Sequence, residues 1–316
     1  MTRSCAECTH EAADSDVYCE ACGAHLAAPE ESGSHVWTTS ASVSGECGHC
    51  GAALGDDRGF CEECGRRQGA GLDRAELRLD GVAAVTDRGH LRHHNEDAIA
   101  IGIDGGGTVA IVCDGVSTSP RADVAAMAAV EAGLPASLRA VTGGMPADGA
   151  LRAGFARAFT AVDALTHPSA ADPSPSGIPS CTYVTALVTA DAIAVGWLGD
   201  SRAYWVPVDG DPRCLTIDDA LPADDGGALT HWVGADAPDD DLHVVTEQPD
   251  GPGSIVLCSD GFWRYLAGPA DLAPVAALPP AVAALSLVQQ ALDGGGADNV
   301  AVAVLAVRQP GGETAP

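Results

Sequence analysis

Short runs of β-branched and apolar residues dominate the chain from residue 81 onward. Most of these runs end at or near Asp, Gly or an Asp-Gly pair, which is typical of strands followed by turns. The predicted strands cover residues 82–85, 98–103, 109–113, 182–189, 192–198, 203–206, 255–258 and 300–307. Two stretches with helical spacing, 122–131 and 150–165, lie between the third and fourth runs, and another lies near 281–292.

This order of elements favours one fold class. Three strands, two helices and three further strands are typical of layered antiparallel sheets with helices outside, not of a doubly wound parallel sheet. We therefore predict an α+β fold, an antiparallel β-sandwich flanked by α-helices. Two acidic segments rich in Pro and Gly, 167–179 and 218–241, are predicted loops, and 309–316 is a predicted frayed tail.

The N-terminal part carries a repeated cysteine pattern. Each copy has two Cys-x-x-Cys pairs ten residues apart, and the second copy follows the first with an offset of 42. The cysteines are Cys5, Cys8, Cys19, Cys22, Cys47, Cys50, Cys61 and Cys64. The pattern predicts zinc ribbons at 1–27 and 45–68, linkers at 28–44 and 69–80, and a main domain at 81–308.

Two Cys-x-x-Cys turns that meet across a hairpin form a tetrahedral site of four thiolates, which suits Zn²⁺. We therefore expect two Zn²⁺ per chain. Disulfides are the alternative, but the first ten residues lack the basic start and apolar centre of a signal peptide. Four scattered cysteines remain, and three of them lie inside or at the edge of apolar runs, where we expect buried free thiols. No CxxxxxR loop surrounds any of the four, which counts against a catalytic cysteine. The four are Cys113, Cys181, Cys214 and Cys258.

Charge and composition exclude several classes of function. Asp and Glu number 44 against 16 Lys and Arg, and the formal net charge of −28 repels a phosphate backbone, so we expect no nucleic acid partner. All of those basic residues are arginine. No apolar stretch approaches the roughly 20 uninterrupted residues of a membrane span. We therefore expect a cytoplasmic protein with no membrane contact.

Carboxylates recur where the predicted strands of the main domain end. Asp114 and Asp260 each follow an apolar run directly, whereas Glu96, Asp97 and Asp298 lie just before one. If adjacent antiparallel strands end at the same edge, these side chains converge there. Such a cluster requires cations to stay ionised, and oxygen ligands alone select Mg²⁺ or Mn²⁺.

The motifs follow an order that identifies a family. RHHNED at 92–97, Asp-Gly at 114–115, GDSRAY at 199–204, LCSDG at 257–261 and DN at 298–299 together resemble the metal-dependent (PPM, type 2C) serine/threonine protein phosphatases. The likeness runs from about residue 81 to residue 307. It implies a central pair of antiparallel sheets with helices outside and a two-metal site at one end of the sandwich.

The resemblance also implies metal ligands. Asp114 would bridge two Mn²⁺ or Mg²⁺ ions, and the carbonyl oxygen of Gly115 would reach one of them. Asp260 and Asp298 would hold the first ion.

Three further residues complete the implied site. Glu96 through water and Asp97 in the outer shell would support the second ion, and Arg92 would clamp the phosphate oxygens. A metal-bridging water would then attack phosphorus in line, without a covalent intermediate.

The sequence departs from the family pattern at several positions. Residues 116–121 (VSTSPR) stand where the family has His or Met followed by glycines, so no histidine is placed as a general acid. We interpret 117–121 as a helix cap rather than a phosphate contact. Before the strand at 182–189, only Asp172 stands near the place where many members carry a third-metal ligand. Asp200 and Arg202 are expected to form a buried structural pair.

Two classes of function remain open at this point. The favoured one is an enzyme that removes phosphate from phosphoserine or phosphothreonine in a phosphoprotein substrate, with the zinc ribbons docking a partner or substrate. A pseudophosphatase scaffold is the alternative, and the presence of every metal carboxylate counts against it. A phosphatase that acts on a regulatory partner differs from the favoured enzyme only in its substrate.

Overall fold

The computed structural model describes residues 73–166, 177–222, 227–238, 241–248 and 251–308, and the backbone of three strands nearer the N-terminus. Those strands are β1 (Thr2–Ser4), β2 (Glu11–Ala13) and β3 (Val36–Thr39). The chain divides into two compact units, Met1–Ser34 and His35–Pro316, and β1 pairs with β2 in the first. The eight cysteines of the predicted zinc ribbons, most of the predicted loop 167–179 and the predicted tail lie outside the described residues.

The first large sheet has the strand order β11-β10-β13-β14-β5-β4, and all neighbours in it are antiparallel. Its members are β4 (Arg74–Leu79), β5 (Val82–Asp87), β10 (Arg202–Pro207), β11 (Arg213–Cys214), β13 (Gly253–Cys258) and β14 (Val300–Val307). The side chains of β14 alternate between two apolar cores, which explains why this strand lies in the interior of the sheet. Val302 and Val304 face one apolar core, and Ala303 and Leu305 face another, so both sides of the strand are buried.

The second large sheet has the order β12-β9-β8-β7-β6-β3 and is also antiparallel throughout. Its remaining members are β6 (Ala98–Asp104), β7 (Gly107–Cys113), β8 (Tyr183–Val188), β9 (Ile193–Leu198) and β12 (His243–Glu247). Apolar side chains of the two sheets pack against each other, among them Ile101, Val112, Ile255 and Leu305.

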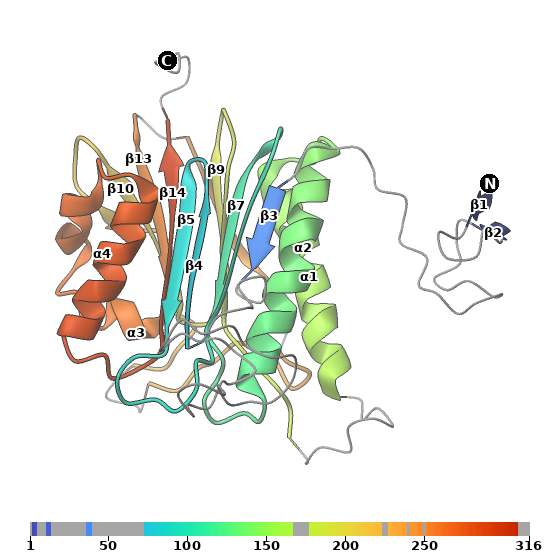
Figure 1. Ribbon diagram of the computed structural model, residues 1–316, viewed down its shortest axis with the longest axis horizontal. Coiled ribbons are helices and arrows are strands. Elements are labelled where there is room, and N and C mark those ends of the chain that lie inside the picture. Colours follow the sequence, from blue (N-terminus) through green and yellow to red (C-terminus); the bar gives the residue numbers. More distant parts are fainter. Residues whose placement is uncertain are drawn as a thin grey trace, which may run out of the picture. The chain divides into compact units, whose positions relative to one another are not determined.

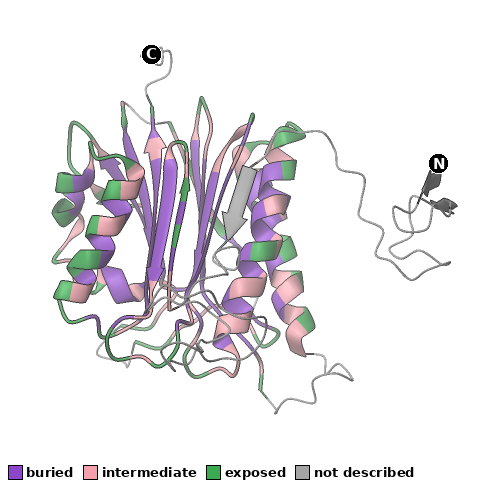
Figure 2. Ribbon diagram, in the orientation of Figure 1, coloured by how far each residue is buried: buried purple, intermediate pink, exposed green. Residues whose placement is uncertain are grey.

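Helices cover the outer faces of both sheets (Figure 1). The pair α1 (Ala122–Thr142) and α2 (Ala147–Asp163) packs on the second sheet, whereas α3 (Asp260–Trp263) and α4 (Pro280–Asp293) pack on the first. The 3₁₀ turns η2 (Ala164–Thr166) and η4 (Pro269–Val275) follow α2 and precede α4. The sandwich interior is buried almost throughout (Figure 2). The predicted fold class is confirmed.

Several element boundaries differ from the prediction. The segment 69–80, expected to be a linker, contains β4, whose residues alternate between buried and exposed positions. Such alternation predicts a strand, but the short segment contains few apolar residues because Arg and Glu occupy the outer positions. Within the expected linker 28–44, β3 pairs with β6 as the edge strand of the second sheet. One residue separates the end of the predicted loop 218–241 from the start of strand β12.

The long helix α1 extends eleven residues beyond its predicted end at 131 and includes Pro135. By length and composition, α1 is the one helix in the described part of the chain that could cross a membrane. Its apolar positions, among them Ala125, Ala129 and Leu134, pack instead against the second sheet and α2.

Candidate active site

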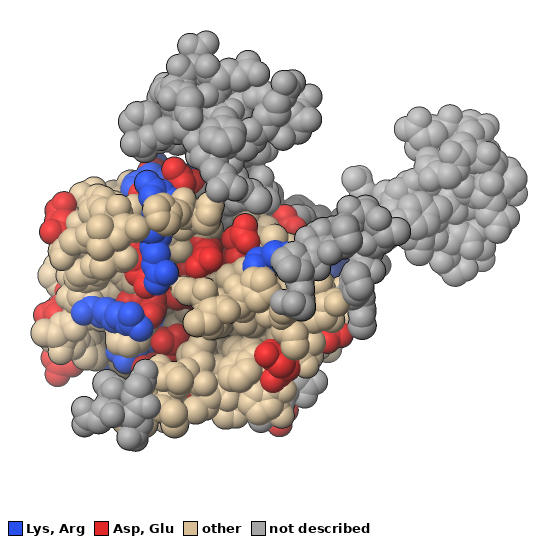
Figure 3. Space-filling model, turned by 90° about the horizontal axis from the view of Figure 1, so that it is seen from below, with Lys and Arg blue, Asp and Glu red and all other residues tan. Residues whose placement is uncertain are grey.

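Every predicted metal carboxylate lies at the same end of the sandwich. Strands β5, β7 and β13 end there, and β6, β8 and β14 begin there, because each of these neighbouring pairs is antiparallel. The register places Ala98 opposite Cys113, so Asp97 and Asp114 come from adjacent strands. This end is the lower one in Figure 1. Figure 3 looks onto it and shows arginine side chains lying beside carboxylates.

Asp97 is the most enclosed of these carboxylates. The Ser259 hydroxyl donates a hydrogen bond of 2.8 Å to Asp97 Oδ2, whereas Oδ1 is buried without a hydrogen-bond partner. Burial, followed by repulsion from Asp260 and Asp298, raises the pKa of Asp97 well above its ordinary value. An orphaned carboxylate oxygen that faces other carboxylates fits a position that supports a bound cation.

Asp114 lies next to Asp97 and Asp260, and burial and the charges of these neighbours raise its pKa well above the ordinary value. Its backbone is fixed by Thr182, whose hydroxyl accepts a hydrogen bond of 3.1 Å from the Asp114 amide. The Thr182 amide donates to the Asp114 carbonyl at 2.7 Å. The strand end therefore holds this carboxylate in a defined place among the others.

Arg92 reaches this cluster from the loop between β5 and β6. Its Nε lies 2.7 Å from Asp298 Oδ1 and its Nη2 lies 2.7 Å from Asp298 Oδ2, so the two groups form a bidentate pair. The Arg92 side chain is 38% exposed and is close enough to Glu96 and Asp114 to interact with their charges. A partly exposed guanidinium at the edge of the cluster can reach a phosphate group from solvent.

Asn299 ties the same loop to the start of β14. Its Oδ1 accepts a hydrogen bond from the Glu96 amide, and its Nδ2 donates to the carbonyl oxygens of Arg88 and His94, each at 2.8 Å. The backbone oxygen of Asn299 also lies where a side chain on Gly261 would stand, only 1.8 Å from a Cβ built there. Sequence reasoning treated Asn299 as part of a motif and assigned it no role.

The region after Asp114 leads into the N-terminus of α1. Arg121 is the N-cap of α1, adopts the left-handed conformation at φ 58° and makes no side-chain capping bond. The Ser119 hydroxyl instead contacts the backbone of Ser180. The segment 117–121 therefore supplies the N-cap residue of α1, as predicted, and does so through its backbone. Ser117 is hydrogen-bonded to Glu96, whose pKa is raised by burial.

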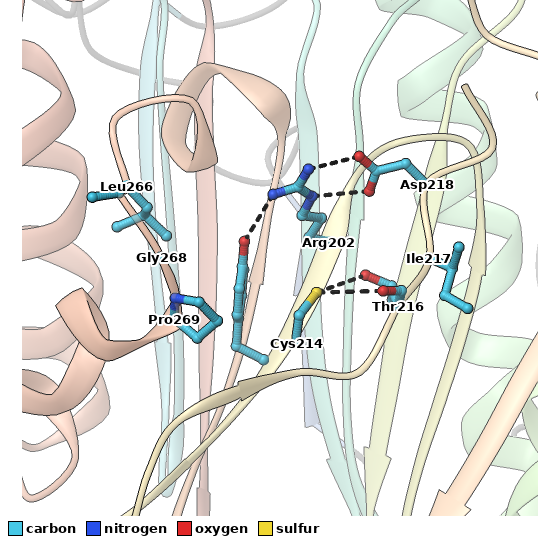
Figure 4. A pocket seen from close by; sticks show the side chains of 10 residues that line it. Arg202, Cys214, Thr216, Ile217, Asp218, Leu266, Gly268 and Pro269 are labelled. Carbon is cyan, nitrogen blue, oxygen red and sulfur yellow. Dashed lines mark hydrogen bonds and ion pairs between the residues drawn. The ribbon is translucent and has the colours of Figure 1, made fainter. Parts of the chain in front are cut away.

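The predicted pairing of Asp200 with Arg202 is wrong. Arg202 binds Asp218 through two hydrogen bonds of 2.9 and 2.7 Å (Figure 4). Asp200 faces Asp260 instead, and burial together with the charges of Asp260 and Asp218 raises the pKa of Asp200 to about 6. Asp200 therefore extends the carboxylate cluster, which sequence reasoning did not foresee.

Arg202 and Asp218 belong to the wall of a cavity of about 470 Å³ between β10, β11 and the segment before η4 (Figure 4). Tyr204, Thr216 and the exposed residue Cys214 also line it, and Leu266, Gly268 and Pro269 lie opposite (Figure 4). The other three cysteines of the main domain, Cys113, Cys181 and Cys258, are buried and free. This agrees with the sequence-based expectation.

The donor set of the cluster fits hard divalent cations. Its ligands are carboxylate oxygens, and three of the carboxyl groups, those of Asp97, Asp114 and Asp260, have pKa values raised first of all by burial. In the described part of the chain, no three His, Cys, Asp or Glu side chains stand ready at metal-ligand spacing. Arg92 binds both oxygens of Asp298, so a cation at Asp298 would displace part of that pairing. Arg264 binds one oxygen of Asp260 and leaves the other outside this ion pair.

Comparisons with known proteins agree with this fold. Among solved structures, the serine/threonine phosphatase Stp1 from Staphylococcus aureus has a TM-score of 0.59 at 19% identity, covering 73% of this chain and 96% of that chain. The Mycobacterium tuberculosis serine/threonine phosphatase PstP/Ppp has a TM-score of 0.55 at 23% identity, covering 74% and 100%. The PstP catalytic domain in complex with two manganese ions has a TM-score of 0.54 at 23% identity, covering 73% and 99%. At these identities the likeness establishes the fold.

Family models extend the comparison to both parts of the chain. A search of curated protein sequences gives no match. A model described as double zinc ribbon matches residues 5–65, in agreement with the predicted cysteine modules. A model described as protein phosphatase 2C matches residues 88–292, which include Arg92, Asp114 and Asp260. Because that match spans more than half of the sequence, the chain belongs to the protein phosphatase 2C family.

Proposed function

We propose that this chain hydrolyses phosphoserine and phosphothreonine in proteins with the help of two divalent cations, Mn²⁺ or Mg²⁺. The observation that carries the proposal is the convergence of buried carboxylates at one end of the sandwich, with the partly exposed Arg92 beside them. Membership of the protein phosphatase 2C family and the two manganese ions in the PstP complex support the same reaction class.

Different carboxylates of the cluster would hold the two cations. Asp114 would bridge the two ions, with the Gly115 carbonyl, Asp260 and Asp298 as further ligands. Glu96 and Asp97 would support the second ion, and both are fixed from outside, Glu96 by Asn299 and Asp97 by Ser259. When bound, such cations lower the pKa of a water molecule and neutralise charge on the phosphoryl oxygens.

Arg92, at the edge of the cluster, would bind the phosphate group. Arg92 would turn part of its fork from Asp298 to the phosphate oxygens, because a guanidinium binds carboxylate and phosphate with the same geometry. It would then stabilise the charge that gathers on the equatorial oxygens as the bond to the leaving group breaks.

The cysteine modules would bind two Zn²⁺ and serve in docking a partner or substrate. A site closed by four cysteines leaves no position open for chemistry. The double zinc ribbon match at residues 5–65 supports the binding of zinc by these cysteines. Metal analysis of the full chain should find two zinc ions, and a chain without zinc would contradict it.

The test of the enzymatic function is phosphate release from a phosphothreonine peptide. We expect release with Mn²⁺ and none with chelator. The control is Asp80→Asn, which changes an exposed aspartate paired with Arg308 beyond the far ends of β5 and β14. A full chain that binds Mn²⁺ and releases no phosphate from any phosphopeptide would support a scaffold function instead.

A further inference from the structure

Arg264 is a second guanidinium at the carboxylate cluster. Its Nη2 lies 2.7 Å from Asp260 Oδ2, one helical turn earlier in the chain. The Arg264 side chain is 57% exposed, whereas that of Asp260 is only 14% exposed. Arg92 therefore holds one carboxylate of the cluster, Asp298, and Arg264 holds another.

An exposed i, i+4 ion pair on a helix usually contributes only a few tenths of a kcal/mol. This pair differs because its acceptor is buried among other acids. Asp260 interacts with the charges of Asp298 and, through a hydrogen bond, with Asp114. Arg264 also acts on the Asp200 carboxylate, where its attraction opposes the rise in the pKa of that group. The guanidinium thus acts on several members of the cluster.

The surroundings of Trp263 hold Arg264 in place. The indole nitrogen of Trp263 donates a hydrogen bond of 2.9 Å to the backbone oxygen of Asp200. The guanidinium carbon of Arg202 lies 3.5 Å from the Trp263 ring centre, and that of Arg264 lies 5.7 Å from it. Arg202 is in turn anchored by Asp218, as Figure 4 shows. The Arg264 guanidinium therefore lies beside the Trp263 ring, whose position is fixed by its contacts with Asp200 and Arg202.

The charges of the site determine what Arg264 can do. Five carboxylates interact with one another here, those of Asp97, Asp114, Asp200, Asp260 and Asp298. Glu96 is the sixth carboxylate of the site, since Arg92 interacts with it as well as with Asp114 and Asp298. Two divalent cations would neutralise four of these six charges and Arg92 a fifth. Asp123 acts on Glu96 from the first turn of α1, where the helix N-terminus offsets its charge. One negative charge is left over, and the Arg264 guanidinium, which is paired with Asp260, can balance it.

We propose that Arg264 is a charge-balancing positioning residue, which neutralises Asp260 so that two divalent cations suffice for the site and a phosphate dianion can approach it. The inference rests on the proposed metal-dependent function and deepens it. It predicts opposite effects on two ligands. Without Arg264 the site is more negative, so it binds Mn²⁺ more tightly and an anionic substrate more weakly.

The size of the effect follows from the geometry. A charge within about 4 to 6 Å of a group shifts its equilibrium by about one to three powers of ten, and solvent exposure favours the low end of this range. We therefore expect Arg264→Gln to lower the Kd for Mn²⁺ by about three- to tenfold and to raise KM for p-nitrophenyl phosphate by about the same factor. Arg264→Lys retains the charge and should restore most of both values.

The experiment measures Mn²⁺ binding to the full chain by the loss of the free Mn²⁺ signal in electron paramagnetic resonance, and kinetics at saturating Mn²⁺. Arg308→Gln is the matched control. Arg308 is 61% exposed and pairs with Asp80 at the end of the sandwich opposite the carboxylate cluster. We expect Arg308→Gln to change neither Kd nor KM. Thermal unfolding of each variant shows whether it is folded.

The sign of the change in Mn²⁺ affinity decides the question. If Arg264→Gln weakens Mn²⁺ binding, or leaves it unchanged while KM stays the same, Arg264 is a structural contact and the inference is overturned. In that case the wild-type chain still hydrolyses phosphate esters with Mn²⁺. A wild-type chain that neither binds Mn²⁺ at this site nor releases phosphate overturns the proposed function and the inference with it.

Discussion

Replacing Asn299 with alanine removes the amide that ties the loop between β5 and β6 to the start of β14. The native side chain makes three hydrogen bonds of 2.8 Å, one to the Glu96 amide and two to the carbonyl oxygens of Arg88 and His94. It is only 4% exposed, so water cannot fully replace them. At about 1 kcal/mol for each bond, the loss is about 3 kcal/mol of unfolding free energy. For a domain of this size that corresponds to a fall in Tm of about 6 to 12 °C.

The same change should affect catalysis, because the released loop carries Arg92 and Glu96. A displacement of about 1 Å at such groups can cost on the order of 100-fold in rate, so kcat/KM for p-nitrophenyl phosphate should fall toward that extent. Gln289→Ala is the control, since its amide bonds only Asp293 on the exposed face of α4. If Asn299→Ala lowers Tm no more than Gln289→Ala and leaves kcat/KM unchanged, Asn299 does not hold the loop.

Four further outcomes are expected. Asp114→Asn should abolish most of the turnover with Mn²⁺, and near wild-type turnover would remove Asp114 from the site. Arg92→Ala should cost about 2 to 4 kcal/mol of transition-state stabilisation, measured as kcat/KM. Without divalent cations, the unfolding free energy should fall as the pH rises from 3.8 to about 6. Burial raises the pKa of Asp200 across this range in the folded state, so the protonated carboxyl favours folding and its loss of a proton does not. Urea unfolding at each pH tests this. Removing residues 1–34 should leave Tm and small-ester hydrolysis unchanged, whereas removing 1–72 should lower Tm because β3 is lost.

The sequence allowed the carboxylate edge to be predicted because the signal is local. Asp114 and Asp260 directly follow apolar runs, and adjacent antiparallel strands that end together bring such residues to one place. The fold class followed from the same runs. The family resemblance added a role for each residue, and the register of β6 with β7 agrees with the convergence of Asp97 and Asp114.

The contacts between side chains were harder to predict, for different reasons. Arg202 and Asp218 are separated by β10, β11 and a turn, so no short-range spacing links them. Asn299 contacts residues more than two hundred positions earlier in the chain. The pair of Asp260 and Arg264 is different, because its i, i+4 spacing is visible in the sequence and could have been found.

Strand β3 makes part of the expected linker between the cysteine modules a member of the second sheet. Val36–Thr39 was expected to be part of a linker because Ser, Ala and Glu dominate the sequence around it. Four of its residues nevertheless pair with Ala100–Ile103 of β6, at an edge that would otherwise present unpaired backbone groups. Strand β6 begins directly after Asp97, so the segment between the two cysteine modules is hydrogen-bonded to a strand that carries a site residue at its start. Part of the expected linker is therefore an edge strand of the sheet that holds Asp97 and Asp114.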